Sequence, residues 1–307
     1  MRRRALILVV PLALAAAVAC SVIADPRAQL AKLGVRYSAD AFVAQAGQGD
    51  LEVVRLFVAS GMSPDVKDQH GANALTAAAA GGHLAVVRLL LEKGAHPNVT
   101  TPDGPSPLTA AIWAGYDDVV ARLLDRGADP NAGDGLRQRP LILAVRARHP
   151  SLVRLLLDKG AHAWEQDDKW SALMLAAFLG DMDSLKLLLA RDANVNAVDS
   201  RGMSAVMHAA STGKTGAIQA LVAKGADVNA HDYAGHTALM FAANNGHADA
   251  VAALKQAGAD LAARTHSGRT ASDYAALNGH AEVVAALRGG VMTQARAAAP
   301  ESGAVNR

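Results

Sequence analysis

The sequence has a single cysteine among 307 residues, few aromatic side chains (4%) and a formal net charge of only +2. One cysteine excludes an internal disulfide framework and any metal site built from several thiolates. The scarcity of aromatic residues, beside 51% hydrophobic residues, favours short helices over a sheet. Arg2, Arg3 and Arg4 are three of the 30 basic residues, so the chain after residue 19 has 27 basic and 28 acidic residues. A net charge of −1 argues against a nucleic-acid-binding protein, which needs a basic surface.

The N-terminus has the pattern of a secretory signal peptide. Three arginines precede an apolar run from Ala5 to Ala19, and small residues follow it. Ala17–Ala19 and Val22–Ala24 each offer a cleavage site of the form small-x-small. We therefore predict a signal peptide within residues 1–24 and a periplasmic mature protein. The alternative is an uncleaved anchor, because the apolar run extended to Ala24 reaches the minimum length that spans a bilayer.

Cys20 stands directly after Ala17-Val18-Ala19. This order resembles the lipobox of bacterial lipoproteins, although that motif usually has leucine where Ala17 stands. The resemblance implies that Cys20 carries a lipid, becomes the new N-terminus and holds the protein at the membrane. In the alternative, Cys20 is removed with the signal peptide. We expect no other link between the chain and a membrane.

Glycines repeat through the chain with a period of 33 residues. One series is Gly94, Gly127, Gly160, Gly225 and Gly258, each followed by alanine, with Asp192 in the missing register after one deletion. Two further series keep the same period, one from Gly71 to Gly268 and one from Gly82 to Gly279. A repeat of this length indicates a stacked array of similar units.

Each period contains two apolar segments with helical spacing. In the second unit these are the alanine-rich segment Ala74–Ala80 and the stripe formed by Leu84, Val87, Leu90 and Leu91. Gly82 separates the two segments and Gly94 ends the second one, as residues that tolerate positive φ do. The period therefore predicts a helix, a turn, a second helix and a loop. One such unit cannot bury its own apolar face, so the units must stack.

These features resemble the ankyrin-repeat family. The clearest unit runs from Asp232 to Ala243 with Gly246-His247 behind it. The resemblance covers about residues 38–289 and implies an all-α solenoid of about eight helix-turn-helix units with β-turn or hairpin fingers. The fourth unit departs from the pattern, because Arg137 and Arg148 stand where glycines are expected. Residues 25–37 are assigned to a linker and residues 290–307, which have no period, to a disordered tail.

Little in the sequence suggests catalysis. Four of the histidines, at 83, 149, 247 and 280, repeat in register and indicate a structural role. His231, His236 and His266 fall on neighbouring fingers and form the one set that suggests a metal site, although exposed fingers rarely supply its supporting contacts. The sequence has no His-Glu-x-x-His motif, phosphate-binding glycine loop or Gly-x-Ser-x-Gly motif. We expect no enzyme, no cofactor and no small-molecule substrate.

The family resemblance implies a concave face that binds another protein through the fingers and the ends of the first helices. Aromatic and arginine side chains carry most of the binding energy at such faces. The alternative for Trp113 and Phe178 is ordinary core packing. Carried over by register, the predicted partner-binding residues are Trp113, Arg146, Trp170, Phe178, Leu179, Arg201, Tyr233, His236 and Asn244.

We expect a non-enzymatic scaffold that is exported to the bacterial periplasm and binds a protein of the cell envelope. Its concave groove supplies the binding surface. One alternative is an immunity-type inhibitor of an envelope toxin. Another is a metal-binding stress protein or an enzyme that uses His231, His236 and His266. A third is a structural scaffold tethered to the membrane.

Overall fold

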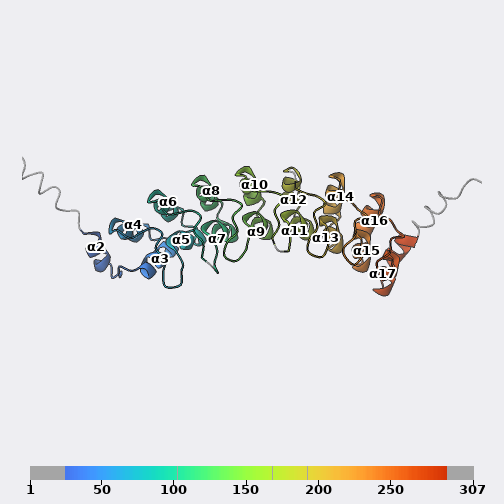
Figure 1. Cartoon of the computed structure of the whole chain (residues 1–307), viewed down its shortest axis with the longest axis horizontal. Helices are drawn as coiled ribbons and strands as arrows, with labels where there is room; N and C mark the ends of the chain where they lie inside the picture. The colour runs from blue at the N-terminus through green and yellow to red at the C-terminus, as the bar shows by residue number, and fades with distance from the viewer. Residues whose placement is uncertain (1–24, 102, 168, 192, 289–307) are drawn as a thin grey trace, which may run out of the picture.

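The computed structural model describes residues 25–101, 103–167, 169–191 and 193–288. Figure 1 shows an arched array of two helix rows, with the connecting loops on the inner side of the arch. The predicted signal peptide, the predicted lipidation site at Cys20 and the predicted disordered tail at residues 290–307 lie outside the described residues. Within the described ranges, no helix has the length and apolar character needed to cross a bilayer.

Each repeat contributes one inner and one outer helix. The inner helices are α3 (Ala39–Gln48), α5 (Ala74–Ala80), α7 (Pro107–Ala114), α9 (Pro140–Arg146), α11 (Ala172–Leu179), α13 (Ala205–Ser211), α15 (Ala238–Asn244) and α17 (Ala271–Leu277). Their outer partners are α4 (Leu51–Ala59), α6 (Leu84–Glu92), α8 (Asp117–Asp125), α10 (Pro150–Asp158), α12 (Met182–Leu189), α14 (Thr215–Ala223) and α16 (Ala248–Gln256), and residues 281–288 are helical after α17. These pairs confirm the all-α repeat solenoid that the 33-residue period predicts.

Inner helices begin at polar residues that cap them. The side chains of Asn73, Ser106, Ser171 and Thr237 each accept the backbone N–H of the residue three positions later. Capping satisfies N–H groups that have no partner inside the helix. Because the cap recurs at the same place in the period, the inner helices start in equivalent positions along the array.

The finger loops are closed by an aspartate and a short antiparallel bridge. Asp68, Asp134, Asp199 and Asp232 each accept the backbone N–H groups of the residues two and four positions later. Antiparallel bridges join Lys67 to Asn73, Gln166 to Ser171, Val198 to Ser204 and His231 to Thr237. The carboxylates thus point into their own turns, which leaves the finger tips to other side chains.

The two arginines of the fourth unit occupy left-handed backbone. Arg137 has φ of 58° and Arg148 has φ of 56°, whereas the residue equivalent to Arg148 in the sixth unit is Gly213, with φ of 67°. A side chain in this region costs about 1–2 kcal/mol. The Arg148 guanidinium donates to the Leu179 carbonyl of the next unit at 3.1 Å, which offsets part of that cost. The turn geometry of the other repeats is therefore kept without glycine.

One apolar core runs between the two helix rows. The outer-helix residues Leu90, Leu123, Leu156, Leu188 and Leu221 are fully buried at equivalent positions of successive units. Small inner-helix residues such as Ala111 are also fully buried and let neighbouring inner helices approach closely. The core therefore depends on contacts between neighbouring units.

The assignment of residues 25–37 to a linker is wrong. This segment contains α2 (Pro26–Lys32), which packs on α4 and buries Leu30 completely. The helix begins at Asp25, whose carboxylate accepts the N–H of Arg27 at 3.1 Å. The segment lies outside the 33-residue period, so the period does not predict a helix there, although an aspartate before Pro26 is itself a helix-start signal.

Candidate protein-binding face

The inner side of the arch carries the finger loops and the exposed ends of the inner helices, and we call it the inner face (Figure 1). Between α7 and the finger of the fourth unit it has an apolar hollow of about 370 Å³. Trp113 and Leu136 line this hollow and are 64% and 49% exposed. Ala80, Pro105, Ala110 and Ala114 complete its apolar lining. This Trp113 hollow has room for one large apolar side chain of a partner.

The Trp113 hollow rests on a rigid polar support. The Asp134 carboxylate accepts the Thr109 hydroxyl at 2.8 Å and two N–H groups of its own finger at 2.9 Å. Thr109 lies on α7 and is 1% exposed. Because Asp134 joins the finger to α7, Leu136 is held opposite Trp113 before any partner arrives, which lowers the entropy cost of binding.

A second aromatic group lies on the fifth and sixth units. The Trp170 and Phe178 rings meet edge to face with centroids 5.2 Å apart, and the Trp170 ring lies 4.1 Å from the ring of His208. Phe178 is 37% exposed, whereas Trp170 is half-buried against the core. Trp170 therefore contributes to packing as well as to the surface, and Phe178 is the more exposed of the pair.

His208 is a buried histidine beneath this pair. It is 1% exposed, and its Nε2 lies 3.0 Å from the Asp199 carboxylate. Burial lowers the pKa of His208 below its ordinary 6.5, and Asp199 offsets only part of this effect. Burial raises the pKa of Asp199, but the N–H groups of Met203 and Arg201 and the His208 ring outweigh it, so this pKa lies below 3.8. At neutral pH a neutral His208 therefore donates through Nε2–H to an ionised Asp199.

Cationic side chains follow one another along the fingers of the fourth to sixth units. Arg137, Lys169 and Arg201 are exposed near the tips of three successive fingers. Arg201 remains 66% exposed although its guanidinium lies 3.5 Å from Asp199. Arg146, at the end of α9, lies 3.4 Å from the carboxylate of Asp167. The cations at the tips are thus more accessible than the described carboxylates of Asp134, Asp167 and Asp199.

The remaining predicted partner-binding residues differ in their exposure and in their contacts with the rest of the protein. Tyr233 is 70% exposed, and its N–H donates to the Arg201 carbonyl at 3.0 Å, so these two residues are neighbours. His236 is half-buried between Asp232 and the Tyr274 hydroxyl, each 3.1 Å from a ring nitrogen. Leu179 packs partly against the core. The Asn244 side-chain oxygen accepts from Asn278 at 2.9 Å, which makes it part of a link between units.

Among the described residues, His231, His236 and His266 are not grouped as metal ligands. Both ring nitrogens of His236 already face protein partners, and His231 lies 3.4 Å from the Asp232 carbonyl. Across residues 25–288, apart from the three undescribed positions, no three His, Cys, Asp or Glu side chains are grouped so that they could hold a metal ion.

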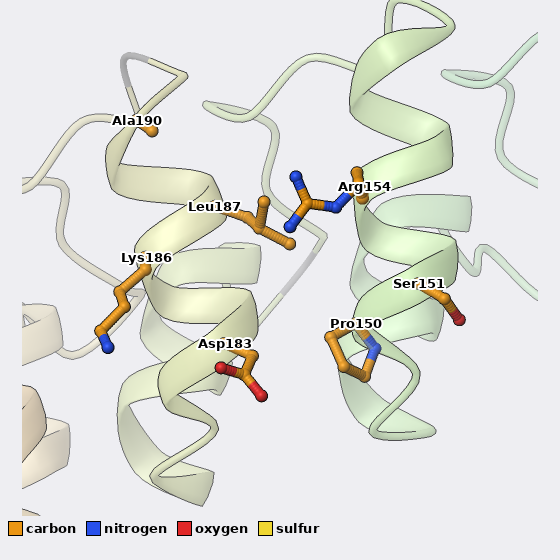
Figure 2. Close-up of a pocket in the computed structure, with 7 residues that line it drawn as sticks. All are labelled: Pro150, Ser151, Arg154, Asp183, Lys186, Leu187 and Ala190. Carbon is orange, nitrogen blue, oxygen red and sulfur yellow. The ribbon is translucent and has the colours of Figure 1, made fainter.

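A hollow of about 400 Å³ also lies on the outer helices, between α10 and α12 (Figure 2). Arg154 points across it from α10, Leu187 and Asp183 approach from α12, and the Lys186 side chain extends away from α10. Its lining combines charges of both signs and contains no aromatic side chain. The inner face therefore offers the stronger apolar anchor.

Sequence reasoning missed Leu136 and Lys169 on the inner face and the buried His208 beneath it. Leu136 replaces polar or small residues that stand at the equivalent finger position, such as His70 and Ala234. His208 replaces alanine, leucine or an aromatic residue at the equivalent helix position. Each departure from the repeat is a usable signal, because stacking does not require it.

Comparison with known proteins agrees with this architecture. The family model described as ankyrin repeats (3 copies) matches residues 42–134, 141–232 and 206–294. The chain belongs to the ankyrin-repeat family, whose members are generally protein–protein interaction scaffolds and typically non-enzymatic. Among solved structures, it is similar to the ankyrin repeat domain of Bcl-3, described as a unique member of the IkappaB protein family. The two share 30% identity with a TM-score of 0.64, over 71% of this chain and 99% of that one. Comparison with curated proteins gives no match.

Proposed function

We propose that this protein is a non-enzymatic scaffold of the bacterial periplasm that binds an envelope protein through its inner face. The observation that carries the proposal is Trp113, a 64% exposed tryptophan beside a preformed apolar hollow at the inner face. A soluble domain gains nothing in folding from such an arrangement, whereas a partner that covers it buries a large aromatic area.

The aromatic residues of the inner face provide the test of binding. Truncation of an interface hot spot costs about 2–4 kcal/mol, which is about thirty-fold to several hundred-fold in affinity. We expect Trp113→Ala and Phe178→Ala to weaken partner capture by this amount with little change in melting temperature, because both side chains are substantially exposed. Trp170→Ala should lower the melting temperature as well, since Trp170 packs on His208.

The binding experiment is a quantitative pull-down from envelope extract with the purified protein and each variant. Arg154→Ala, on the outer hollow, is the matched control and should retain the partner. Asn244→Ala should cost much less than the aromatic variants, because Asn244 is engaged with Asn278. If Trp113→Ala and Phe178→Ala stay folded and still capture the same partner, the inner face is not the binding surface.

Export is supported by the residue pattern at Arg2–Ala24 and has its own test. The mature N-terminus should be Cys20 or Asp25, as determined by intact mass after cell fractionation. An unprocessed Met1 form in the inner membrane would contradict this. If Cys20 is lipidated, Cys20→Ala should release a membrane-bound pool, and unchanged fractionation of that variant would rule out the lipid anchor.

A further inference from the structure

We infer that the inner face recognises an extended acidic segment of its protein partner, with one large apolar side chain seated in the Trp113 hollow. This inference rests on the proposed function and names the chemistry of the partner. Two independent features carry it: the apolar hollow at α7 and the row of cations on the next three fingers.

The charge of the inner face changes sign along the array. The finger of the third unit has the exposed Asp103 at its tip, while those of the fourth, fifth and sixth units have Arg137, Lys169 and Arg201. The side chain of Arg201 is 66% exposed. A segment that leaves the Trp113 hollow toward the sixth unit passes cations, and one that leaves it toward the third unit meets Asp103.

Three described carboxylates of these fingers, those of Asp134, Asp167 and Asp199, are turned inward. Asp134 accepts two backbone N–H groups and the Thr109 hydroxyl. Asp167 accepts two backbone N–H groups and faces Arg146, and Asp199 faces His208. Asp134 and Asp199 are 8% and 7% exposed. A partner therefore meets the arginine and lysine side chains before these carboxylates, which favours acidic residues.

The repeat geometry sets the spacing of the recognised residues. Packed helices lie about 8–10 Å apart, so successive fingers are separated by about 10 Å. An extended chain advances about 3.3 Å per residue, which gives about three residues per finger. The expected segment has a large apolar residue with acidic residues about three and six positions away, opposite Lys169 and Arg201.

A pair of synthetic peptides tests this directly. One is acetyl-Ser-Gly-Phe-Ser-Gly-Glu-Ser-Gly-Glu-Ser-Gly-amide, and the other has the same residues in reverse order, because the chain direction of the partner is open. Isothermal titration calorimetry with the purified full chain should show one of them binding more tightly than its two controls. The first control has lysine in place of both glutamates, and the second has alanine in place of phenylalanine.

Variants of the protein assign the contacts. Trp113→Ala should weaken the better peptide at least about thirty-fold, as expected for an anchor residue. Lys169→Ala and Arg201→Ala should each weaken it about 1.5- to 5-fold, the range of an exposed ion pair, and less so at high salt. A peptide whose distal glutamate is replaced by lysine should regain affinity for Arg201→Glu.

Several outcomes would overturn the inference. The inference is wrong if the lysine peptides bind as tightly as the glutamate peptides, or if neither glutamate peptide binds at millimolar concentration. It is also wrong if a simple polyphosphate competes fully with the bound peptide. None of these affects the pull-down with Trp113→Ala, so a protein partner captured through the inner face would still support the proposed function. Loss of peptide binding in Arg154→Ala would place the contact on the outer hollow instead.

Discussion

The turn between the two helices of a repeat allows a sharp test of how neighbouring units lock together. Gly213 and Gly225 both belong to the sixth unit and have φ of 67° and 86°. A Cβ on Gly213 would lie 2.7 Å from Nδ1 and 2.8 Å from Cγ of His247 in the next unit, whereas a Cβ on Gly225 would meet nothing within 4 Å. Alanine at either position adopts unfavourable backbone, but only at Gly213 does it also collide with a neighbour.

These distances set the expected loss in the free energy of unfolding for each glycine variant. Left-handed backbone costs an alanine about 1–2 kcal/mol, and the loss of glycine's freedom in the unfolded chain returns about 0.4–1 kcal/mol. Gly225→Ala should therefore cost about 1 kcal/mol. Gly213→Ala must also displace His247, whose Nε2 lies 3.3 Å from the Ser211 carbonyl. Overpacking adds about 1–3 kcal/mol.

A double-mutant cycle with His247→Ala isolates the collision. In that background Gly213→Ala should cost no more than Gly225→Ala, because the ring is gone. The free energy of unfolding is measured by urea titration followed by circular dichroism. Equal costs of the two glycine variants in the wild-type background would refute the argument that the inter-helix glycine is required by the neighbouring ring.

Two further predictions concern the core and the buried histidine. Leu156→Ala removes a fully buried side chain from the unit that already carries two left-handed arginines, and should cost about 2–5 kcal/mol. Circular dichroism and fluorescence should then show two unfolding steps; one coincident transition would argue against a weak centre. His208 has a lowered pKa, so between that pKa and pH 6.5 the unfolded chain binds a proton that the folded chain does not. Stability should fall on acidification below that pH by at most about 1.4 kcal/mol per pH unit, and less steeply in His208→Gln; parallel pH profiles would exclude this role.

The repeat pattern predicts the helices because stacking requires the same packing in every unit. Leu90, Leu123 and Leu156 recur at equivalent positions and are all fully buried. The same reasoning locates the turns even where arginine replaces the glycine that the repeat predicts, since Arg137 and Arg148 adopt φ of 58° and 56°. Each of these turns is closed by its own hydrogen bond, from the Arg137 N–H to the Asp134 carbonyl and from the Arg148 N–H to the Val145 carbonyl, and glycine is only the least costly residue there.

The 33-residue period cannot predict features that occur only once in the chain. α2 is a single element that packs on α4, and no repeat of its pattern exists from which to infer it. The half-buried state of Trp170 depends on His208, which lies 38 positions later and has no equivalent histidine in the neighbouring repeats. Register therefore predicts that Trp170 lies near the inner face, but not how much of its ring is covered.

The binding face is expected where the repeat pattern is broken, because packing leaves those positions unconstrained. The position of Trp113 holds Ala80 in the preceding unit and Arg146 in the following one, so stacking does not select tryptophan there. The same holds for Leu136 at a finger tip. Asp134 and Thr109, which hold that finger against α7, are buried and hydrogen-bonded in the free protein. A tip residue that differs between units, held on a fixed support, suits recognition of a specific partner, since the support lowers the entropy cost of binding and the tip supplies the contact.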